Sequence, residues 1–363
     1  MEEPGRLLRI VNASAPVRIC DNGGWTDTWF AGEGKVTNIA VYPFVEVQMK
    51  VREHAGGSER ITICAEDYGD RYTIAEPRGD YGKHPLLEAA MDFMEIPADV
   101  AIEVSIHSEV PAGASTGTSA AVSVALIGTL DTLTPGGMTP GEVAASAHRI
   151  ETELLKLQSG IQDQLASAHG GINFIEMHAY PHATVHPVRV SDGLWRALDS
   201  RLSLIFLGES HSSSAVHEMV IQRLEASGPG APELVPLREA ARKAAEALRA
   251  DDLDAFGHAM IANTEAQRAL HPKLVGARHR QVIAIAEAHD AVGWKVNGAG
   301  GDGGSVTILS GPDATRKRAM VRAIEASDAK FRNIPITLSR FGLRVRESPA
   351  GSSRIPPQTE DVN

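Results

Sequence analysis

The stretch Pro111-Ala-Gly-Ala-Ser-Thr-Gly-Thr-Ser-Ala-Ala121 is the most informative part of this chain. The alternating run before it, residues 102–109, predicts a strand, and the apolar run after it, residues 122–130, predicts a buried helix. Small side chains allow backbone N–H groups to approach an oxyanion, and the first turn of a helix adds unpaired donors and the positive end of its dipole. We therefore predict an anion site here, with the hydroxyls of Thr118 and Ser119 placed to reach a metal ion that accompanies a phosphate.

The composition of the whole chain is that of an ordinary soluble globular protein. Its 363 residues are 43% hydrophobic and 22% charged, and the length favours two domains. The net charge of −11 argues against a nucleic-acid partner but is compatible with a single nucleotide held by loop amides and Mg²⁺. The cysteines, Cys20 and Cys64, are expected to be packing residues in a reducing compartment. No apolar run is long enough to span a bilayer and the start, Met1-Glu-Glu-Pro, is unlike a signal peptide, so we expect a cytoplasmic protein without membrane contact.

The mixture of strand and helix patterns predicts an α+β architecture in two halves, with a boundary near residue 190. We expect strands at residues 7–11, 36–51, 102–109, 172–176, 202–207 and 305–309, and within 334–345. We expect helices at residues 85–96, 139–154, 161–169, 231–270, 279–289 and 315–326. The best helix start is Thr139, where Glu142 completes a capping box. Residues 15–28 contain too many turn formers for regular structure, and the tail from Glu347 is expected to be disordered.

Two further segments are rich in glycine. The first is Arg18-Ile-Cys-Asp-Asn-Gly-Gly-Trp-Thr-Asp27, and the second is Lys295-Val-Asn-Gly-Ala-Gly-Gly-Asp-Gly-Gly304. The second contains a G-x-G-x-x-G pattern, but a strand-like run follows it instead of a helix, so the context of a dinucleotide fold is missing. A Walker A loop is excluded as well, because Thr118 stands where that motif requires lysine. Any one of these segments is compatible with a simple tight turn, but three of them in one chain favour a shared site.

Together these motifs resemble those of the GHMP kinases, the small-molecule kinases that include galactokinase, homoserine kinase and mevalonate kinase. Residues 111–121 align without a gap with the family motif P-x-x-x-G-L-G-S-S-A-A. Residues 18–28 resemble the G-G-W-[ST]-D-T form of fucokinases and heptose 7-phosphate kinases, and residues 160–171 resemble the G-x-Q-D-Q-x-A-x-x-x-G-G of the same sugar kinases. Residues 295–304 are similar to the C-terminal glycine loop of the family.

The resemblance implies a two-domain fold with the ATP and sugar site between the domains. We expect an N-terminal ribosomal-protein-S5-like domain at residues 1–191, a ferredoxin-like α/β sandwich at residues 192–346 and a flexible tail at residues 347–363. The implied ATP-binding residues are Pro111, Gly113, Ala114, Ser115, Thr116, Gly117, Thr118 and Ser119.

The resemblance also implies catalytic and metal-binding residues. Asp163 corresponds to the general base that takes the proton from the sugar hydroxyl, and Arg18 corresponds to the basic residue that keeps this carboxylate ionised. A purely structural salt bridge is the alternative for Arg18. Glu151 corresponds to a Mg²⁺ ligand, with Ser119 or Thr118 as the second protein oxygen, and a helix-surface glutamate is the alternative.

Around the acceptor, the resemblance implies that Asp27 binds a pair of sugar hydroxyls, although a turn-capping aspartate is the alternative. Trp25 either gives the sugar an apolar face or packs the loop. The other implied substrate-binding residues are Gly24, Thr26, Gly300 and Gly301. Residues 211–214 and 263–268 are further candidates for the pocket, and Arg268, Lys273, Arg278 and Arg280 are candidate partners for a substrate phosphate.

The chain departs from the family pattern at three positions. Ser115 and Thr116 replace the usual Gly-Leu of the phosphate loop, so Ser115 must adopt backbone geometry that glycine normally supplies. Asp302 interrupts the C-terminal glycine run, and we expect it to point away from the phosphates or to contact Mg²⁺ or the sugar.

The sequence therefore predicts an ATP- and Mg²⁺-dependent sugar kinase, a monomer or homodimer, that forms a sugar 1-phosphate from a heptose 7-phosphate or a fucose-like hexose. A kinase for an isoprenoid or amino-acid alcohol is a rival, against which the Asp27 segment argues. A catalytically inactive nucleotide or sugar sensor is a second rival, which Ser115, Thr116 and Asp302 keep open.

Overall fold

The computed structural model describes residues 5–54, 56, 60–75, 79–135, 137–208 and 214–350. Its strands are β1 (Leu7–Asn22), β2 (Gly34–Glu53), β3 (Ile61–Ala65), β4 (Asp70–Ile74), β5 (Val100–Ser108), β6 (Ile172–Ala179), β7 (His182–Pro187), β8 (Leu202–Phe206), β9 (Gly293–Val296), β10 (Ser305–Leu309), β11 (Arg332–Ile334), β12 (Thr337–Leu338) and β13 (Arg344–Pro349). Its α-helices are α1 (Pro85–Phe93), α2 (Thr118–Asp131), α3 (Pro140–Arg149), α4 (Gln162–His169), α5 (Asp192–Arg201), α6 (Ser214–Ser227), α7 (Val235–Arg249), α8 (Leu253–Leu270), α9 (Ala277–Ala288) and α10 (Ala314–Ser327).

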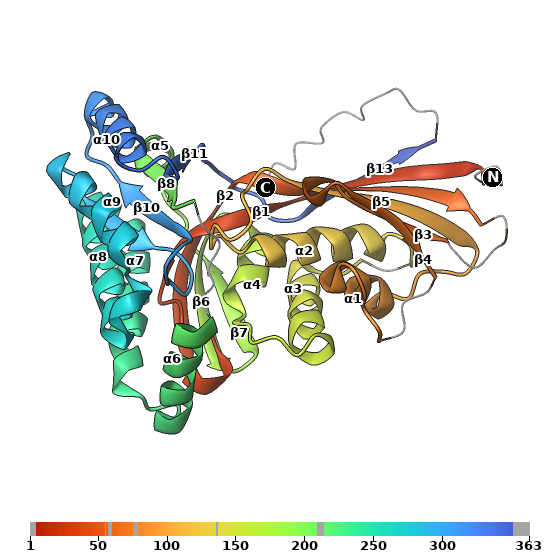
Figure 1. Cartoon of the computed structure of the whole chain (residues 1–363), viewed down its shortest axis with the longest axis horizontal. Coiled ribbons are helices and arrows are strands. Elements are labelled where there is room, and N and C mark those ends of the chain that lie inside the picture. The colour runs from red at the N-terminus through yellow and green to blue at the C-terminus, as the bar shows by residue number, and fades with distance from the viewer. Residues whose placement is uncertain are drawn as a thin grey trace.

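The predicted α+β architecture is confirmed. The larger sheet has the strand order β13-β1-β2-β5-β3-β4, with β12 and β6 on β2 and β7 on β6. The smaller sheet has the order β11-β8-β10-β9. Figure 1 shows α1, α2, α3 and α4 on one face of the larger sheet, whereas α7, α8 and α9 form a layer near the smaller sheet. Helix α7 also contacts β1 and β2 of the larger sheet, so the two parts share a packed boundary.

Strand β1 is longer than the sequence predicts. Residues 15–22 were expected to be irregular, and this expectation is wrong, because they pair antiparallel with β2. The register shifts between Pro16 and Val17 and again between Ile19 and Asn22. Proline and turn-forming residues are tolerated in a strand at such bulges, where one ladder hydrogen bond is lost locally. The bulged end of β1 carries Arg18 toward the middle of the molecule.

The helix predictions are correct where local capping signals exist. The Thr139–Glu142 capping box is present at the start of α3, which ends in a π-helical turn at Ile150–Leu154. The prediction of a continuous helix over residues 231–270 is wrong, because α7 and α8 are separate helices. The Asp252 side chain caps the start of α8 by accepting from the Ala255 backbone N–H. Helix α2 is buried on nearly all sides, as its apolar sequence predicts.

The end of the chain returns to the larger sheet. Strand β12 pairs with β2, and β13 pairs with β1, so the expected disorder from residue 347 is wrong for residues 347–349. Residues 351–363 lie outside the described part of the chain. The division at residues 191 and 192 stays a prediction, and it leaves these two late strands in the earlier sheet.

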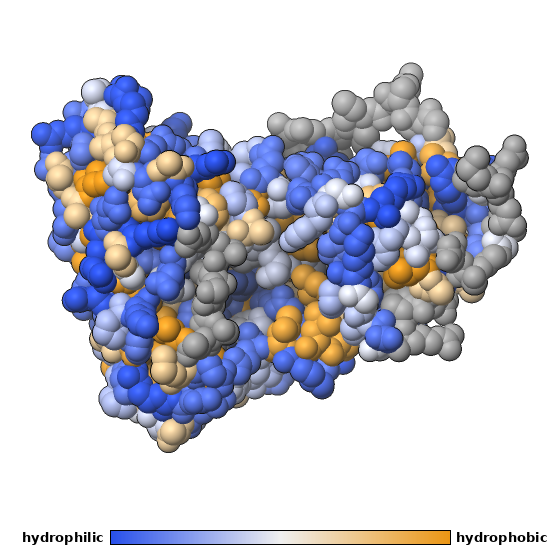
Figure 2. Space-filling view, in the orientation of Figure 1, coloured by the Kyte–Doolittle hydropathy of each residue, from blue (hydrophilic) through white to orange (hydrophobic). Residues whose placement is uncertain are grey.

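The helices give no membrane signal: among the described residues, none is both long and apolar enough to cross a bilayer. On the face of the molecule that Figure 2 shows, hydrophilic residues dominate and apolar residues form separate groups.

Candidate active site

Two cavities adjoin at the boundary between the β1 end and the glycine loops. The acceptor cavity, about 410 Å³, is lined by residues 24–25, 27–30, 158–160 and 162–163, by part of α6 and by Gly298 and Ala299. The phosphate cavity, about 790 Å³, is lined by residues 108–119 together with residues 84–87 and Tyr68. Both cavities share Arg18, Asp163, Gly298 and Ala299. A group transferred between ligands of the two cavities would therefore pass beside Arg18 and Asp163.

Asp163 and Arg18 form a two-pronged ion pair at this junction. Asp163 lies in the first turn of α4, and Arg18 comes from the bulged end of β1. The Arg18 Nε donates to Asp163 Oδ1 at 2.7 Å, and Nη2 donates to Oδ2 at 3.2 Å. The third nitrogen, Nη1, donates to the backbone oxygen of Ser115. Burial alone would lower the pKa of Arg18, but Asp163 and Asp21 raise it, so the guanidinium stays charged beside the Asp163 carboxylate.

The phosphate loop is folded as its sequence requires. Ser115 has φ 58°, so it adopts the left-handed conformation that glycine normally supplies, as expected. The Arg18 backbone N–H donates to Thr116 O at 2.9 Å, which fixes the loop against β1. Thr116 is buried, and its hydroxyl lies 3.2 Å from that of Thr118. The eight predicted ATP-binding residues all line the phosphate cavity.

Gly117 lies directly against the predicted base. Its φ is 72°, and a Cβ at this position would lie 3.1 Å from both Cγ and Oδ2 of Asp163. A side chain at this position would therefore be strained by its backbone conformation and would require Asp163 to move by a few tenths of an ångström. We expect Gly117→Ala to lower the free energy of unfolding by about 1–3 kcal/mol and to displace Asp163, which would lower kcat. Chemical denaturation and steady-state kinetics measure the two effects.

The matched control for that substitution is Gly141→Ala. Gly141 lies in the first turn of α3, and a Cβ there would meet nothing within 4 Å among the described residues. We expect this variant to be unchanged in kcat and stabilised by up to about 1 kcal/mol. Wild-type stability and kcat in Gly117→Ala would contradict the close packing of the loop on Asp163.

Asp27 reaches the acceptor cavity from the turn after β1. Its side chain is only 4% exposed, and its Oδ2 accepts from the Gln162 backbone N–H at 3.2 Å. A Cβ on Gly160 would lie 2.2 Å from the same oxygen, so glycine is needed at that position. Burial, and then the neighbouring charge of Asp163, raise the pKa of Asp27 to about 6. Asp27 is therefore a carboxylate whose ionisation requires compensation by a ligand or by solvent.

This raised pKa predicts how stability depends on pH. Between the unfolded pKa of 3.8 and the folded pKa of about 6, the folded state holds a proton that the unfolded state has released. Stability therefore falls as the pH rises, and the loss from Asp27 between about pH 5 and pH 8 is about 1.4 kcal/mol. In Asp27→Asn this part of the slope should be absent. Urea unfolding at both pH values measures it, and equal slopes in variant and wild type would contradict the assignment.

The other predicted substrate residues divide into two groups. Trp25 and Gly24 line the acceptor cavity, and Trp25 is buried with an edge-to-face contact to His217 at 5.6 Å. Thr26, Gly300 and Gly301 do not line it. The Thr26 hydroxyl donates to the backbone oxygen of Gly23, and a Cβ on Gly300 would lie 2.2 Å from Leu274 O. These three residues therefore pack behind the residues that line the cavity.

Three further expectations concern the rim of the site. Asp302 is exposed and lines neither cavity, which agrees with the expectation that it points away from the phosphates. Asn263 is buried and accepts from the Gly23 backbone N–H at 2.6 Å, whereas Arg268 pairs with Glu265 on the exposed side of α8. Residues 211–213 lie outside the described part of the chain, and the side chain of residue 214 is not described either.

Glu151 has the chemistry of a metal ligand. Its side chain is buried, and Oε2 accepts from Ser159 Oγ at 2.6 Å and from Gln164 Nε2 at 2.8 Å. Its Oε1 has no hydrogen-bond partner among the described residues. Burial raises the pKa of Glu151 to about 7, so its charge is uncompensated in the protein alone. An unpartnered carboxylate oxygen fits Mg²⁺, which commonly takes one or two protein groups plus phosphate oxygens and water.

Glu151 and the two candidate hydroxyl ligands differ in their position relative to the cavities. Thr118 and Ser119 line the phosphate cavity, whereas Glu151 lines neither cavity. Within the described ranges, no group of three or more His, Cys, Asp or Glu side chains could hold a metal ion by itself. A magnesium ion here therefore depends on phosphate oxygens for much of its coordination.

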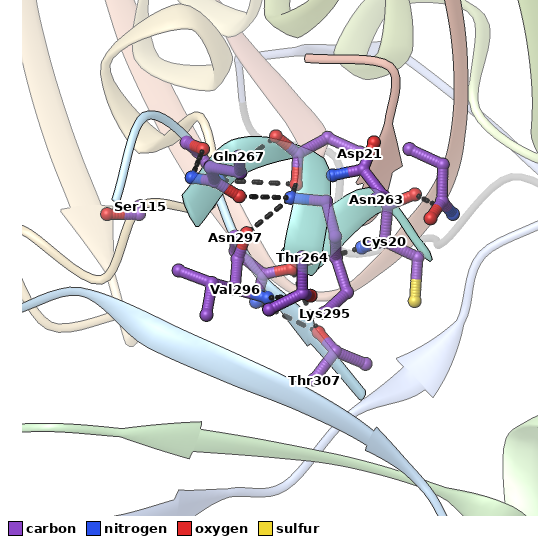
Figure 3. Close-up of polar contacts among 12 residues, drawn as sticks. Cys20, Asp21, Ser115, Asn263, Thr264, Gln267, Lys295, Val296, Asn297 and Thr307 are labelled. Atoms are coloured by element: carbon purple, nitrogen blue, oxygen red, sulfur yellow. Dashed lines mark hydrogen bonds and ion pairs between the residues drawn. The ribbon is translucent and has the colours of Figure 1, made fainter. Parts of the chain in front are cut away.

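A buried ionic cluster, which the sequence did not predict, connects the glycine segments at residues 18–27 and 295–304. Asp21 is fully buried, its carboxylate accepts from the Gly298 backbone N–H at 3.0 Å, and Lys295 Nζ lies 3.3 Å from its Oδ1. Figure 3 shows Lys295 pointing toward Asp21 and Gln267. Burial lowers the pKa of Lys295, while Asp21 opposes this shift. The only sequence signal was the presence of charged residues of opposite sign in the two glycine segments, Asp21 in one and Lys295 in the other.

Comparisons with known proteins point to the small-molecule kinases. Residues 85–171 match the family model described as the N-terminal domain of GHMP kinases. Mevalonate kinase of Pyrococcus horikoshii is 28% identical over 94% of this chain and 99% of its own length. D-glycero-alpha-D-manno-heptose 7-phosphate kinase of Campylobacter jejuni is 22% identical over 91% and 97%.

The fold comparison agrees. The crystal structure of a D-glycero-D-manno-heptose 1-phosphate kinase from Bacteroides thetaiotaomicron superposes with a TM-score of 0.70 at 20% identity, over 93% of this chain and 98% of that one. Residues 85–171 are thus similar to the N-terminal domain of GHMP kinases, and the relatives named above are kinases, which transfer a phosphoryl group to an alcohol.

Proposed function

We propose that this kinase transfers the γ-phosphoryl group of ATP to a hydroxyl of a sugar. The observation that carries the proposal is the Arg18–Asp163 ion pair at the only junction the two cavities share among the described residues. ATP would lie in the phosphate cavity, with its phosphates against the loop amides of residues 113–119 and the N-terminus of α2. The sugar would lie in the acceptor cavity.

In the proposed mechanism, Asp163 accepts the proton of the sugar hydroxyl through a carboxylate oxygen. The hydroxyl oxygen forms a bond to the γ-phosphorus while the bond to the β–γ bridging oxygen breaks, and ADP leaves with that electron pair. Arg18 holds Asp163 in place through two hydrogen bonds, and its charge also stabilises negative charge that develops on the transferred group. Glu151 and Ser119, with Thr118 as the alternative, would hold Mg²⁺, which supplies positive charge to the phosphates.

We also propose that the anomeric hydroxyl is the acceptor, which gives a sugar 1-phosphate. Asp27 supports this assignment, because its buried carboxylate faces the acceptor cavity and is suited to two adjacent sugar hydroxyls. A heptose 7-phosphate and a fucose-like hexose are the candidate acceptors, and they differ in charge. A cytoplasmic location and a monomeric or homodimeric state complete the proposal.

The test is ADP release by the purified full chain with ATP, Mg²⁺ and a panel of neutral and phosphorylated sugars. We expect at least one sugar to raise the rate of ADP release well above the rate measured without an acceptor. Tight ATP binding without turnover on any sugar would instead favour the sensor.

A further inference from the structure

The charged groups on the acceptor cavity wall are mostly acidic. Asp21, Asp27, Asp163 and Glu218 line the cavity, and Arg18 is the sole lysine or arginine that does so among the described residues. The nitrogens of Arg18 donate to Asp163 and to Ser115 O, with Asp21 beside them. Behind the wall, Lys295 pairs with Asp21, so four carboxylates face two cations, and both cations are already engaged with carboxylates. The wall therefore keeps an excess of negative charge.

The histidine on the wall does not change this balance. His217 Nε2 lies 3.1 Å from the backbone oxygen of Gly300, a geometry in which that nitrogen donates its proton. Burial lowers the pKa of His217, so the ring is neutral at neutral pH. Its edge-to-face contact with Trp25 adds to the apolar part of the wall.

The cations expected to receive a substrate phosphate lie elsewhere. None of Arg268, Lys273, Arg278 and Arg280 is among the described residues that line the acceptor cavity. Arg268 pairs with Glu265, and Arg280 donates to Val275 O. Residues 209–213 lie outside the described part of the chain, and their sequence, Glu-Ser-His-Ser-Ser, contains neither lysine nor arginine.

The remainder of the wall suits an uncharged polyol. Trp25, Trp29, Phe30 and Ile221 give it an apolar side, against which the C–H face of a sugar can pack. The buried Trp25 Nε1 and Gln162 Oε1 have no hydrogen-bond partners among the described residues. One is a donor and the other an acceptor, and a neutral hydroxyl satisfies either.

We propose that the acceptor cavity selects an uncharged sugar and rejects acceptors that carry a phosphate or a carboxylate. The inference rests on the proposed sugar kinase function and chooses between its two candidate acceptors. Heptose 7-phosphate and mevalonate, after which the two curated relatives are named, are both anions at neutral pH. Either would place a second anion beside the γ-phosphate, on a wall that has no free cation in its described part.

The experiment compares kcat/KM for neutral and anionic acceptors with the full chain, ATP and Mg²⁺. The panel is L-fucose, D-galactose, unphosphorylated D-glycero-D-manno-heptose, its 7-phosphate and (R)-mevalonate. The best acceptor should be neutral, with kcat/KM above that of every anion by about tenfold or more at low salt. A higher kcat/KM for the heptose phosphate or for mevalonate would overturn the inference.

Calorimetric binding of the same panel separates this inference from the proposed function. If no acceptor supports ADP release, the kinase proposal fails, and binding still tests the charge preference. Tighter binding of a neutral sugar than of any anion supports the inference. Tighter binding of an anion, or no binding of any neutral sugar, overturns it.

A charge reversal tests the cause of the selection. Glu218 is exposed on α6 and lines the cavity, so Glu218→Lys should raise kcat/KM for the anionic acceptors, relative to neutral ones, by about tenfold. The matched control, Met219→Lys, adds a cation at the next position, which does not line the cavity, and should leave that ratio within about twofold. An unchanged ratio in Glu218→Lys would contradict electrostatic rejection.

Discussion

Replacing Asp163 by asparagine is expected to lower kcat by about 10²–10⁴-fold, which is the usual contribution of a general base. Asparagine has nearly the same shape and retains an oxygen that can accept from Arg18, so the fold and the loop should be preserved. The affinity for ATP should change little, because asparagine keeps the shape that packs against Gly117 and the loop amides of residues 113–119 are unchanged. Steady-state kinetics and calorimetric ATP binding measure the two quantities.

The matched control is Asp192→Asn. Asp192 also pairs with an arginine, Arg340 at 2.8 Å, but its side chain is 77% exposed and lines neither cavity. Its kcat should equal that of the wild type. A kcat for Asp163→Asn within about tenfold of wild type would remove Asp163 from the role of base.

Replacing Arg18 by methionine is expected to cost about 3–5 kcal/mol of unfolding free energy and most of the activity. Arg18 is 4% exposed and compensates Asp163 and Asp21, so its loss leaves two carboxylates without their shared cation. Chemical denaturation measures the stability, and kcat is measured under conditions where the variant is folded. A loss below about 1 kcal/mol would show that the pair is no stronger than a surface ion pair.

Two further variants separate charge from geometry. Arg18→Lys keeps the positive charge but cannot donate to Asp163 and to Ser115 O at once. Compared with Arg18→Met, it should therefore regain a larger part of the lost unfolding free energy than of the lost kcat. Arg268→Met removes an exposed arginine that pairs with Glu265 and should cost less than about 1 kcal/mol. Full recovery of kcat in Arg18→Lys would show that charge alone suffices.

Local signals predicted local structure well. The Thr139–Glu142 capping box and the glycines after α4 lie within one or two turns of the elements that they delimit, so the sequence specifies them directly. The continuation of β1 through residues 15–22 could not be predicted in the same way. It depends on pairing with β2 across two register shifts, which no local propensity of Pro16 or Asn22 indicates.

The same distinction applies to the candidate site. Asp163 and Arg18 are 145 positions apart, and only the family resemblance predicted that they meet. Asp21 and Lys295 form a comparable buried pair across the chain, but no motif assigned them a role, so only the structure found it. Thr26, Gly300 and Gly301 were placed on the wall by motif alone, whereas the structure has them packing behind it.

Similarity and site chemistry give different indications of the acceptor. A mevalonate kinase aligns over nearly the whole chain, yet the acceptor cavity combines Asp27 with an acidic wall that disfavours a carboxylate-bearing alcohol. The charged residues on the wall of the acceptor cavity are mostly acidic, whereas an anionic acceptor needs a free cation there. The wall therefore decides the proposed substrate class.

The most direct measurement of the central claim is phosphorus NMR of the reaction products. The full chain is incubated with ATP, Mg²⁺ and each acceptor of the panel in turn, including (R)-mevalonate. The account predicts ADP together with a new phosphomonoester resonance that is coupled to an anomeric proton, and predicts its absence in Asp163→Asn. A product from mevalonate and from no sugar, or unchanged ATP with every sugar, would contradict the claim that this protein is a sugar kinase.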